Sequence, residues 1–492
     1  MSWLATVALS SDTEAGDWMA NASYHNNTVD FFDNAVGGLK VDGNGRCIFA
    51  GTGAPGLGVG CLSPYGTITG IAGSNGFTVS GGGTYSPQAY LMKNSSDNIY
   101  GLYSLTYDSP VPGTTTEGFT ILSFNSTTGA STVYNYGRAD YSFSDSPFTQ
   151  MTSGAFDGSD NFYGFGRIRR AGSYEYPFLV KYNSSGVVQW TKGLQPSEYI
   201  YSGNGYADNI SKLLVDSSGN SYFVLRRNLT SPPSTDYILL KYNSSGVQQW
   251  VRELDSGLNM AGLQVTDGTN IYILNASGVL IAVSCSTGAV SWERTIYNSD
   301  FTSFNGNNAS AVLYDGYLYC SFHTSSGSHV IAKVSTSGTL DWGREISVPF
   351  PPVGTGFQTG VIGDVDDNKM YFYFEGPTSQ SVTTFKLPTD GSKTGTHTFP
   401  NLISYGGSEP YSYTLVEFDI LYADKSLIAA TTSGQSTTST TWSDFTPTIG
   451  WTKADVTKVE FDVSLSQADV QTYRAPSNIY NPVTIAEKRD IN

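Results

Sequence analysis

The stretch FLVKYNSSGVVQW (residues 178–190) decides the fold, and it returns as ILLKYNSSGVQQW at residues 238–250. Each copy has an alternating run of apolar and polar residues, a Ser/Gly turn and a second run that carries a tryptophan. This pattern predicts a β-hairpin. Looser copies end at Trp292 and Trp342. Because a hairpin alone cannot bury its apolar face, copies at regular spacing predict a stacked or closed array.

The turn glycines of these hairpins measure the repeat. Successive glycines lie 42 to 63 residues apart, at or above the roughly 40–50 residues of a known propeller blade. They are Gly66, Gly129, Gly186, Gly246, Gly288, Gly338 and Gly391. Seven repeats therefore cover about residues 36–400, and the excess length is expected in loops.

A second signal precedes the hairpins: an apolar run, an Asp-rich turn and an aromatic run. Examples are LKVDGNGRCIFAG from Leu39, LLVDSSGNSYFVL from Leu213 and VIGDVDDNKMYFYF from Val361. Each repeat thus offers four strands, with tight turns after the first and the third strand. Four such strands form one propeller blade, so the predicted fold class is an all-β, single-ring β-propeller.

The ends of the chain bear on how the ring closes. Residues 413–450 resemble the first strands of one more blade, but no clean fourth strand follows them. SWLATVAL at residues 2–9 places Trp3 at the fourth-strand position that Trp190 has in its repeat. A ring whose last blade takes strands from both termini has no open sheet edge. We therefore predict eight blades in preference to seven, closed by strands from both termini.

These features divide the chain into a closing strand and lead-in at residues 1–35, a propeller at residues 36–465 and an extended arm at residues 466–492. Prolines in the arm withhold backbone donors and make it a poor interior strand. Tyr473 and Tyr480 are among its apolar anchors. Two interpretations stay open: the arm docks on an adjacent subunit, as in strand-addition recognition, or it wraps the outer wall of its own propeller.

A family resemblance rests on two of the repeats. VSCSTGAVSW (residues 283–292) and KVSTSGTLDW (residues 333–342) resemble the repeat of pyrroloquinoline-quinone-type propellers, whose fourth-strand tryptophan packs between neighbouring blades. The resemblance covers the seven repeats, is specific in the turn and the tryptophan, and implies the fold. Enzymes of that family use adjacent cysteines, a calcium site and a tryptophan floor around the quinone. This chain has no adjacent cysteines and no recognisable calcium-plus-base set, so we expect no quinone activity.

Charge and composition exclude several classes of partner. The 492 residues include 54 glycines and 13% aromatic residues, and the formal net charge is −16. Nucleic acid and anionic membranes reward clustered Lys and Arg, so neither is expected as a partner. The N-terminal MSWLATVALSSDTEAG has no basic residue before its apolar run, which predicts that there is no signal peptide. No stretch approaches the length of a membrane span, so no membrane insertion is expected.

Catalytic and metal-binding motifs are weak throughout. The four histidines form no HxH or HExxH pattern, so zinc has little support. DVDDNK, from Asp364, has the clustered carboxylates of a calcium loop, but it occupies the Asp-rich turn position, where such residues fold back on backbone amides. The turn is the favoured interpretation. The four cysteines are scattered and there is no GxSxG elbow, so we expect no enzyme activity, no metal and no cofactor, although acid–base carboxylate pairs stay open.

The connections between blades carry aromatic residues interleaved with Ser, Gly and Asn. Such loops resemble recognition surfaces, in which rigid rings supply contact area and small polar residues supply hydrogen bonds. The predicted binding residues, with those of the arm, are Tyr141, Phe143, Tyr199, Tyr201, Tyr206, Tyr405, Tyr411, Tyr473 and Tyr480. The alternative, which also stays open, is that the rings fold inward and cap the gaps between blades.

Function is less specified than fold. In composition the chain resembles the propeller-type virion tail proteins of bacteriophages. The leading hypothesis is a non-enzymatic structural subunit of a viral particle, a tail component that contacts other virion proteins or copies of itself and is assembled in the host cytoplasm. The second is a propeller that binds a host surface receptor or a glycan through the aromatic face. The third is a quinone-type or glycan-cleaving enzyme.

Overall fold

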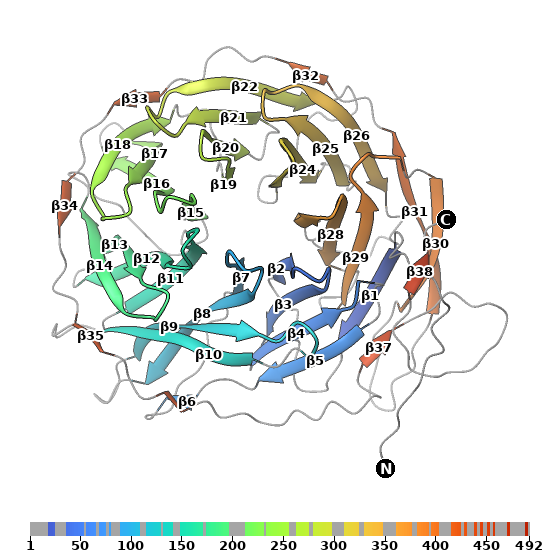
Figure 1. Ribbon diagram of the computed structural model, residues 1–492, viewed down its shortest axis with the longest axis horizontal. Coiled ribbons are helices and arrows are strands. Elements are labelled where there is room, and N and C mark those ends of the chain that lie inside the picture. Colours follow the sequence, from blue (N-terminus) through green and yellow to red (C-terminus); the bar gives the residue numbers. More distant parts are fainter. Residues whose placement is uncertain are drawn as a thin grey trace.

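The fold is an all-β propeller in which seven antiparallel sheets stand around a central axis (Figure 1). The computed structural model describes residues 18–24, 36–53, 56–64, 68–74, 78–79, 89–108, 115–128, 131–140, 148–170, 174–195, 212–230, 233–254, 262–274, 279–297, 309–323, 329–347, 361–375, 381–392, 395–402, 415–424, 428–430, 437–439, 443–445, 450–452, 456–457, 470–472 and 488–490. None of these residues forms a helix of the length and apolarity that crossing a membrane requires.

The first three blades follow the chain from the axis outward, each strand antiparallel to the next. Blade 1 contains β2 (Val36–Val41), β3 (Cys47–Gly53), β4 (Gly56–Leu62) and β5 (Ile68–Ser74). Blade 2 contains β7 (Ala89–Lys93), β8 (Ile99–Asp108), β9 (Thr115–Phe124) and β10 (Ser131–Asp140). Blade 3 contains β11 (Phe148–Phe156), β12 (Phe162–Arg170), β13 (Tyr174–Tyr182) and β14 (Val188–Gln195).

The next three blades repeat this arrangement. Blade 4 contains β15 (Leu214–Val215), β16 (Ser221–Thr230), β17 (Pro233–Tyr242) and β18 (Gln248–Leu254). Blade 5 contains β19 (Gly262–Thr266), β20 (Asn270–Leu274), β21 (Val279–Ser284) and β22 (Val290–Tyr297). Blade 6 contains β23 (Ser310–Tyr314), β24 (Tyr317–His323), β25 (His329–Ser335) and β26 (Leu340–Ser347).

Blade 7 closes the ring with a strand from the other end of the chain. It contains β27 (Val361–Asp366), β28 (Lys369–Glu375), β29 (Ser381–Pro388) and, in the fourth position, β1 (Trp18–Tyr24). The innermost strands of successive blades lie against one another, and β27 lies against β2. The prediction of eight blades is therefore wrong, because the seventh blade already takes its outer strand from the N-terminus.

The register of β1 shows which residues do the closing. Trp18 lies opposite Lys386 of β29, the same relation that Trp190 has to Lys181 in blade 3. The N-terminal tryptophan at the fourth-strand position is thus Trp18. The strand predicted for this place, at residues 2–9, lies outside the described residues.

After blade 7 the chain runs back around the outside of the ring, where it adds strands to the outer edges of the blades (Figure 1). β31 (Leu415–Asp424) pairs with β26 of blade 6 and also with β30 (Gly395–Leu402). Blades 5, 4, 3 and 2 then receive β32 (Ile428–Ala430), β33 (Thr437–Ser439), β34 (Ser443–Phe445) and β35 (Gly450–Thr452). Residues 413–450, predicted to start an eighth blade, instead provide these outer strands.

The last strands of the chain continue this outer belt. β36 (Val456–Thr457) pairs with β6 (Thr78–Val79), and β37 (Val470–Thr472) and β38 (Lys488–Asp490) both pair with β1 of the same chain. An edge strand presents unpaired N–H and C=O groups, and covering it removes a site of unwanted strand pairing. Within the predicted arm, the two described segments therefore have the backbone pairing of a segment that wraps its own propeller.

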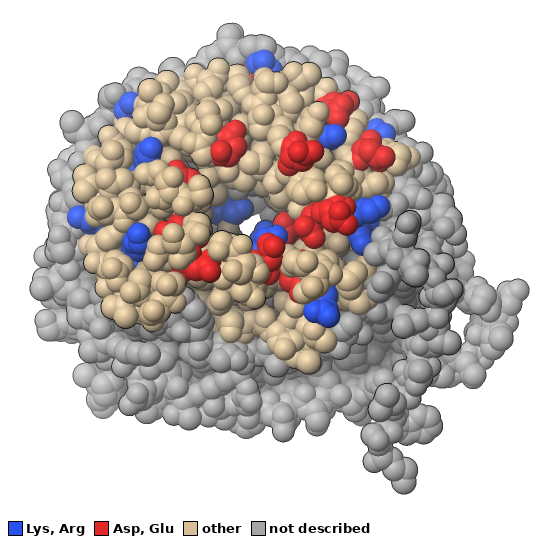
Figure 2. Space-filling view, in the orientation of Figure 1, with Lys and Arg blue, Asp and Glu red and all other residues tan. Residues whose placement is uncertain are grey.

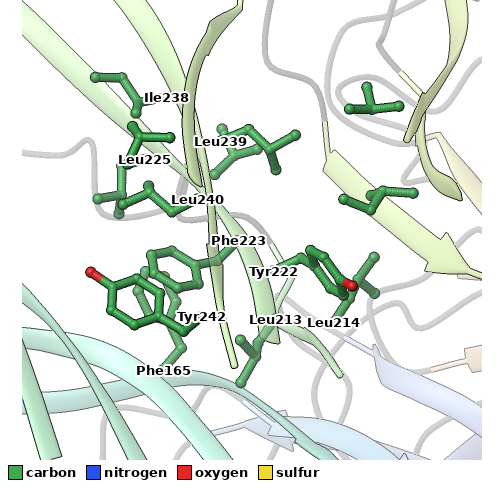
Figure 3. Packing of buried hydrophobic residues seen from close by; sticks show 14 of the residues in the cluster. Phe165, Leu213, Leu214, Tyr222, Phe223, Leu225, Ile238, Leu239, Leu240 and Tyr242 are labelled. Carbon is green, nitrogen blue, oxygen red and sulfur yellow. The ribbon is translucent and has the colours of Figure 1, made fainter. Parts of the chain in front are cut away.

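The core fills the gaps between blades with aromatic and branched side chains. In Figure 3, Phe165 of β12 lies beside Phe223 of β16, with ring centroids 4.6 Å apart. Tyr242 of β17 also stacks on Phe223, with ring centroids 5.7 Å apart. The same cluster reaches into blade 5 through Ile271 and Val283. Each blade therefore buries its faces against its neighbours, as the hairpin repeats require.

The Asp-rich turns are held by their own first side chain. In blade 3 the Oδ1 atom of Asp157 accepts hydrogen bonds from the backbone N–H groups of Ser159 and Asn161, each at 2.9 Å. Asp216 does the same for Ser218 and Asn220 in blade 4. A short carboxylate that accepts from nearby amides is a recognised way to fix a turn, so these carboxylates are structural.

The repeated tryptophans join each blade to the next one. The indole N–H of Trp190 donates to the carbonyl of Ser244, in the hairpin turn of blade 4, at 3.1 Å. Under that ring lies Gly246, whose φ is +73°; a Cβ atom there would lie 2.8 Å from the indole. Glycine is required both by the left-handed backbone and by the close approach of the ring.

The same contact recurs around the ring. Trp250 donates to Cys285 of blade 5 at 3.1 Å, and Trp292 donates to Thr336 of blade 6 at 2.9 Å. Trp342 donates to Thr389 of blade 7 at 3.2 Å. We call this contact between an indole and the following blade the indole clamp. It connects blades 3 to 7 in an unbroken series.

At the junction between blade 7 and blade 1, which we call the seam, a lysine makes the contact to the following blade. The ammonium of Lys386 donates to the carbonyl of Pro64, in the hairpin turn of blade 1, at 3.1 Å. Lys241 makes the equivalent contact with Cys285, which also accepts from the indole of Trp250. Blade 7 is therefore tied to blade 1 by the same kind of polar contact that ties the other blades together.

We predict that the N-terminal strand is needed for a stable ring. Deleting residues 1–24 removes β1 and should lower the unfolding free energy by several kcal/mol, since six residues of backbone pairing with β29 are lost. Deleting residues 1–10 leaves β1 in place and is the control. Urea unfolding of the two truncated chains measures the difference, and equal midpoints would contradict this closure.

We also predict that Trp250, which is 8% exposed, is structural. Trp250→Ala should destabilise the protein by roughly 3–5 kcal/mol, the usual cost of removing a buried large side chain. Trp250→Phe keeps most of the apolar contact and loses the N–H donor, so its loss should be about 1–2 kcal/mol. The unfolding free energies of both variants test this order; an alanine variant as stable as the native protein would refute the clamp.

Candidate functional site

The predicted aromatic recognition surface lies outside the described residues. This holds for all nine predicted binding residues, Tyr141, Phe143, Tyr199, Tyr201, Tyr206, Tyr405, Tyr411, Tyr473 and Tyr480. The described residues belong to the blades, to the turns after the first and third strands, and to the outer belt. Among them, the lysines and carboxylates considered below lie on or beside the innermost strands.

The suspected calcium loop at DVDDNK is a strand end followed by a hairpin turn. Asp364 lies on β27, and the turn connects Asp366 to Lys369 through Asp367 and Asn368, whose φ angles are +44° and +57°. The favoured interpretation as a turn is thus correct for residues 366–369. Within the described part of the chain, no three or more His, Cys, Asp or Glu side chains are grouped to hold a metal ion.

Three lysines lie on or beside innermost strands, close to the Asp-rich turns. Lys40 lies on β2, Lys93 ends β7, and Lys212 stands just before β15. Innermost strands line the axis of the propeller. Figure 2 shows a narrow opening at this axis, with atoms of both basic and acidic side chains around it. We call the three lysines and Asp364 the channel cluster.

Asp364 is the buried carboxylate of the channel cluster. The residue is 6% exposed, and Oδ2 accepts a 3.0 Å hydrogen bond from the backbone N–H of Val41 in blade 1. Its Oδ1 accepts from the N–H of Val365, also at 3.0 Å. The ammonium of Lys93 lies 3.7 Å from Oδ2. This one carboxylate therefore links blades 7, 1 and 2.

The positive charge of Lys93 is balanced by two nearby carboxylates. Its ammonium lies 3.2 Å from Oδ1 of Asp97, in the turn of the same blade, as well as near Asp364. Burial by itself lowers the pKa of Lys93, but Asp364 and then Asp97 outweigh it and hold the pKa above its ordinary value. Lys93 is therefore a permanent cation that is tied to its two partners.

Lys40 is held differently. Its ammonium donates to the carbonyl oxygen of Gly363 at 2.7 Å, a neutral acceptor. Burial lowers the pKa of Lys40, Asp364 raises it, and the like charge of Lys93 lowers it again. The balance is a lysine whose charged form is less favourable than in water.

Lys212 has the most perturbed ammonium group of the three. Burial first, and the like charge of Lys40 second, lower its pKa to about 7, while Asp364 acts in the opposite direction. A lysine is strongly affected in this way when it is desolvated beside another cation. Lys40 and Lys212 belong to different blades, blade 1 and blade 4.

The sequence contained a signal for this cluster, but sequence reasoning missed it. In three repeats a lysine stands within four residues before the first residue of the Asp-rich turn: Lys40 before Asp42, Lys93 before Asn94, and Lys212 before Asp216. Because the run before that turn is the first strand, and first strands line the axis, these lysines could have been placed in the channel.

The cysteines offer little reactivity. All four are buried and free: Cys47, Cys61, Cys285 and Cys320. Burial raises the pKa of the Cys47 and Cys285 thiols, so the nucleophilic thiolate is disfavoured at neutral pH. Among the described lysines, Lys212 therefore stands out, because its pKa is lowered to about 7.

Comparison with known proteins supports the repeat type. The family model of the outer membrane protein assembly factor BamB matches residues 175–371. No curated protein matches the sequence. Nothing in the matches points to a bacteriophage protein. The chain therefore carries PQQ-like, BamB-type propeller repeats, as the resemblance of the hairpins implied.

Similar solved structures share little sequence identity with this chain. BamB from Moraxella catarrhalis is 14% identical, with a TM-score of 0.35, and the match covers 72% of this chain and 85% of that one. The periplasmic gluconolactonase PpgL from Pseudomonas aeruginosa is 12% identical, with a TM-score of 0.40, and the match covers 76% and 97% of the two chains.

We predict that Lys212 makes the stability of the protein depend on pH. The ordinary lysine pKa is 10.5 and that of folded Lys212 is about 7, so between these values the unfolded chain binds one more proton. Unfolding free energy therefore rises with pH through this window, and the full cost of the buried charge applies below it.

The variant Lys212→Met removes that cost. It should raise the unfolding free energy most at about pH 6 and least at about pH 10. Urea unfolding of the native protein and the variant at both values gives the difference directly. A difference that does not change with pH would show that Lys212 titrates as an ordinary lysine.

Proposed function

We propose that the protein is a non-enzymatic structural and interaction subunit of a larger assembly, and that this assembly is a viral particle, with a bacteriophage tail as the favoured case. Its partners would be other particle proteins or further copies of itself. It would reach the particle from the host cytoplasm. The described residues supply a rigid ring for such a role.

The observation that carries the proposal is the way the ring is braced. Indole clamps join blades 3 to 7 in series, and Lys386 ties blade 7 to blade 1. Outer strands cover the edges of blades 2 to 6. A ring fixed in this way has little freedom to close around a substrate, which favours a scaffold over an enzyme with moving parts. Partners would then bind at its two faces.

The matching family supports an assembly role in a general way. Its name is that of an outer membrane protein assembly factor, a protein whose named role is to assist assembly and not to catalyse a reaction. The shared repeat makes a non-catalytic use of this propeller reasonable, although a fold by itself hosts many functions.

A second candidate is a propeller that binds a receptor or a glycan. It is favoured by the aromatic residues that the sequence places between blades, with Tyr199, Tyr201 and Tyr206 in one connection. Aromatic residues among Ser, Gly and Asn are typical of recognition loops. The two candidates differ in the partner that is bound.

The composition of the particle tests the first candidate. Particles of a virus that encodes this chain should be purified as a band in a density gradient. The proteins in that band are then quantified by mass spectrometry. We expect the chain in the band at a fixed ratio to the other particle proteins. A chain that stays in the soluble fraction would refute the role as a particle subunit.

The contact surface is tested by substitution. Replacing Tyr199, Tyr201 and Tyr206 by Ser should leave the melting temperature unchanged and weaken attachment to the particle, or to an arrayed glycan under the second candidate, by at least about tenfold, the loss expected for central aromatic contacts. The control replaces Val187 and Val247, which are 57% and 54% exposed at hairpin turns, by Ser. A lower melting temperature in the tyrosine variant would mean that these rings cap the blades.

A further inference from the structure

The outer edge of blade 1 differs from the edges of the other blades. Among the described residues no further strand pairs with β5, which ends a four-stranded sheet. Blades 2 to 6 each receive a strand of the outer belt, and blade 7 receives β37 and β38 beyond β1. An edge strand presents unpaired N–H and C=O groups to which another strand can be added. The edge of β5 is therefore an interaction surface, and the belt indicates what occupies it.

The belt passes the blades in a fixed order. Its strands pair first with blade 6, then with blades 5, 4, 3 and 2, and finally with blade 7. In the ring, blade 1 lies between blades 2 and 7, with its innermost strand against both (Figure 1). The part of the belt that corresponds to blade 1 is therefore the segment between β35 and β37, residues 453–469.

Belt strands pair with the end of the outer strand of a blade. β34 pairs with residues 193–195, the last three residues of β14, and β33 pairs with residues 252–254, the last three of β18. The same relation holds in blades 2 and 5. The corresponding residues of β5 in blade 1 are residues 72–74.

The pairing of β36 with β6 supplies a register for this edge. Val456 lies opposite Val79, and Thr457 lies opposite Thr78, in antiparallel orientation. β6 follows β5 in the chain, so each step forward from β36 corresponds to a step back toward β5. Continued without a bulge, this register places residues 461–463 opposite residues 74–72. These are the edge residues that the other blades indicate.

The sequence at this place alternates as a strand does. VEFDVSL (residues 459–465) has an apolar residue at every second position and polar residues between them. A period of two is typical of a β-strand with one buried face. The seven residues lie outside the described residues, and the belt order, the register and this alternation all point to them.

We propose that residues 459–465 of the same chain add to the outer edge of blade 1, antiparallel to β5, with residues 461–463 opposite residues 74–72. The added strand satisfies the outward N–H and C=O groups at the end of β5. It completes the outer belt on all seven blades. It also covers an edge that could otherwise pair with a strand from a second copy of the protein.

An engineered disulfide tests the register. Ala72→Cys combined with Val463→Cys places two cysteines opposite each other on antiparallel strands, where the Cα atoms are about 4.5–5.5 Å apart and a disulfide fits. After mild oxidation, peptide mass spectrometry should find this link within one chain. The control combines Ala72→Cys with Asp462→Cys, whose side chain points to the other side of the strand, and should link at least about tenfold more slowly. The four native cysteines are buried in both variants.

Hydrogen exchange tests the same edge without new cysteines. Replacing residues 459–465 by a Gly/Ser run of equal length should speed exchange of the outward amides at the end of β5 at least about tenfold, because they lose their carbonyl partners. The control makes the same replacement at residues 446–449, between β34 and β35. It should leave the exchange of β5 unchanged.

The outcomes are separable. A disulfide between two chains, seen as a dimer on a non-reducing gel, would assign the edge to a second copy and overturn the proposal. Equal linking of the two cysteine pairs would refute the register. Unchanged exchange of β5 in the Gly/Ser variant would show that another segment covers the edge or that none does. None of these results depends on whether the protein belongs to a viral particle.

Discussion

The propeller depends on one contact, the hydrogen bond from a fourth-strand indole to a turn carbonyl of the next blade. A blade cannot bury both of its faces alone, so stability comes from the junctions between blades. At each clamped junction the indole covers a turn whose glycine has a left-handed backbone, as Gly246 does beneath Trp190. The tryptophan of one repeat thus requires the glycine of the next repeat. The repeated sequence therefore specifies the contact between blades as well as the structure of each blade.

The seam shows the same constraint met with different chain segments. In blade 7 the third and fourth strands are β29 and β1, which lie far apart in the sequence, yet Trp18 lies opposite Lys386 in the register of the other blades. Lys386 donates to Pro64 as Lys241 donates to Cys285. Because the junction between blade 7 and blade 1 has the same geometry as the other junctions, the ring closes with seven blades. The described strands beyond blade 7 then pair along the outer edges.

Sequence reasoning succeeded where signals are local and failed where they are not. The hairpins were predictable because a turn glycine fixes the register of two adjacent runs, as in residues 178–190. The closing strand is not joined to β29 by a turn, so the sequence around Trp3 and Trp18 does not show which of the two tryptophans lies on the strand that pairs with β29. The predicted number of eight blades was wrong for this reason. The outer belt was missed because its strands, such as Thr437–Ser439, are too short to show alternation. The channel lysines were visible in the sequence, but only a ring geometry shows that the first strands of different blades line one axis.

Many of the positive charges serve the junctions between blades. The protein has 26 Lys and Arg residues, and several serve the junctions: Arg252, Arg294 and Arg344 lie against the clamped indoles, while Lys181 and Lys241 donate to the turns they face. These side chains gain a carbonyl or a ring for each charge that they bury. Lys40 follows the same rule, since its ammonium donates to the carbonyl of Gly363 in blade 7. Lys212 carries the largest cost, because burial and the like charge of Lys40 lower its pKa to about 7. Its charged form therefore lowers the stability of the ring, whereas the cations at the junctions are held by the turns and rings that they join.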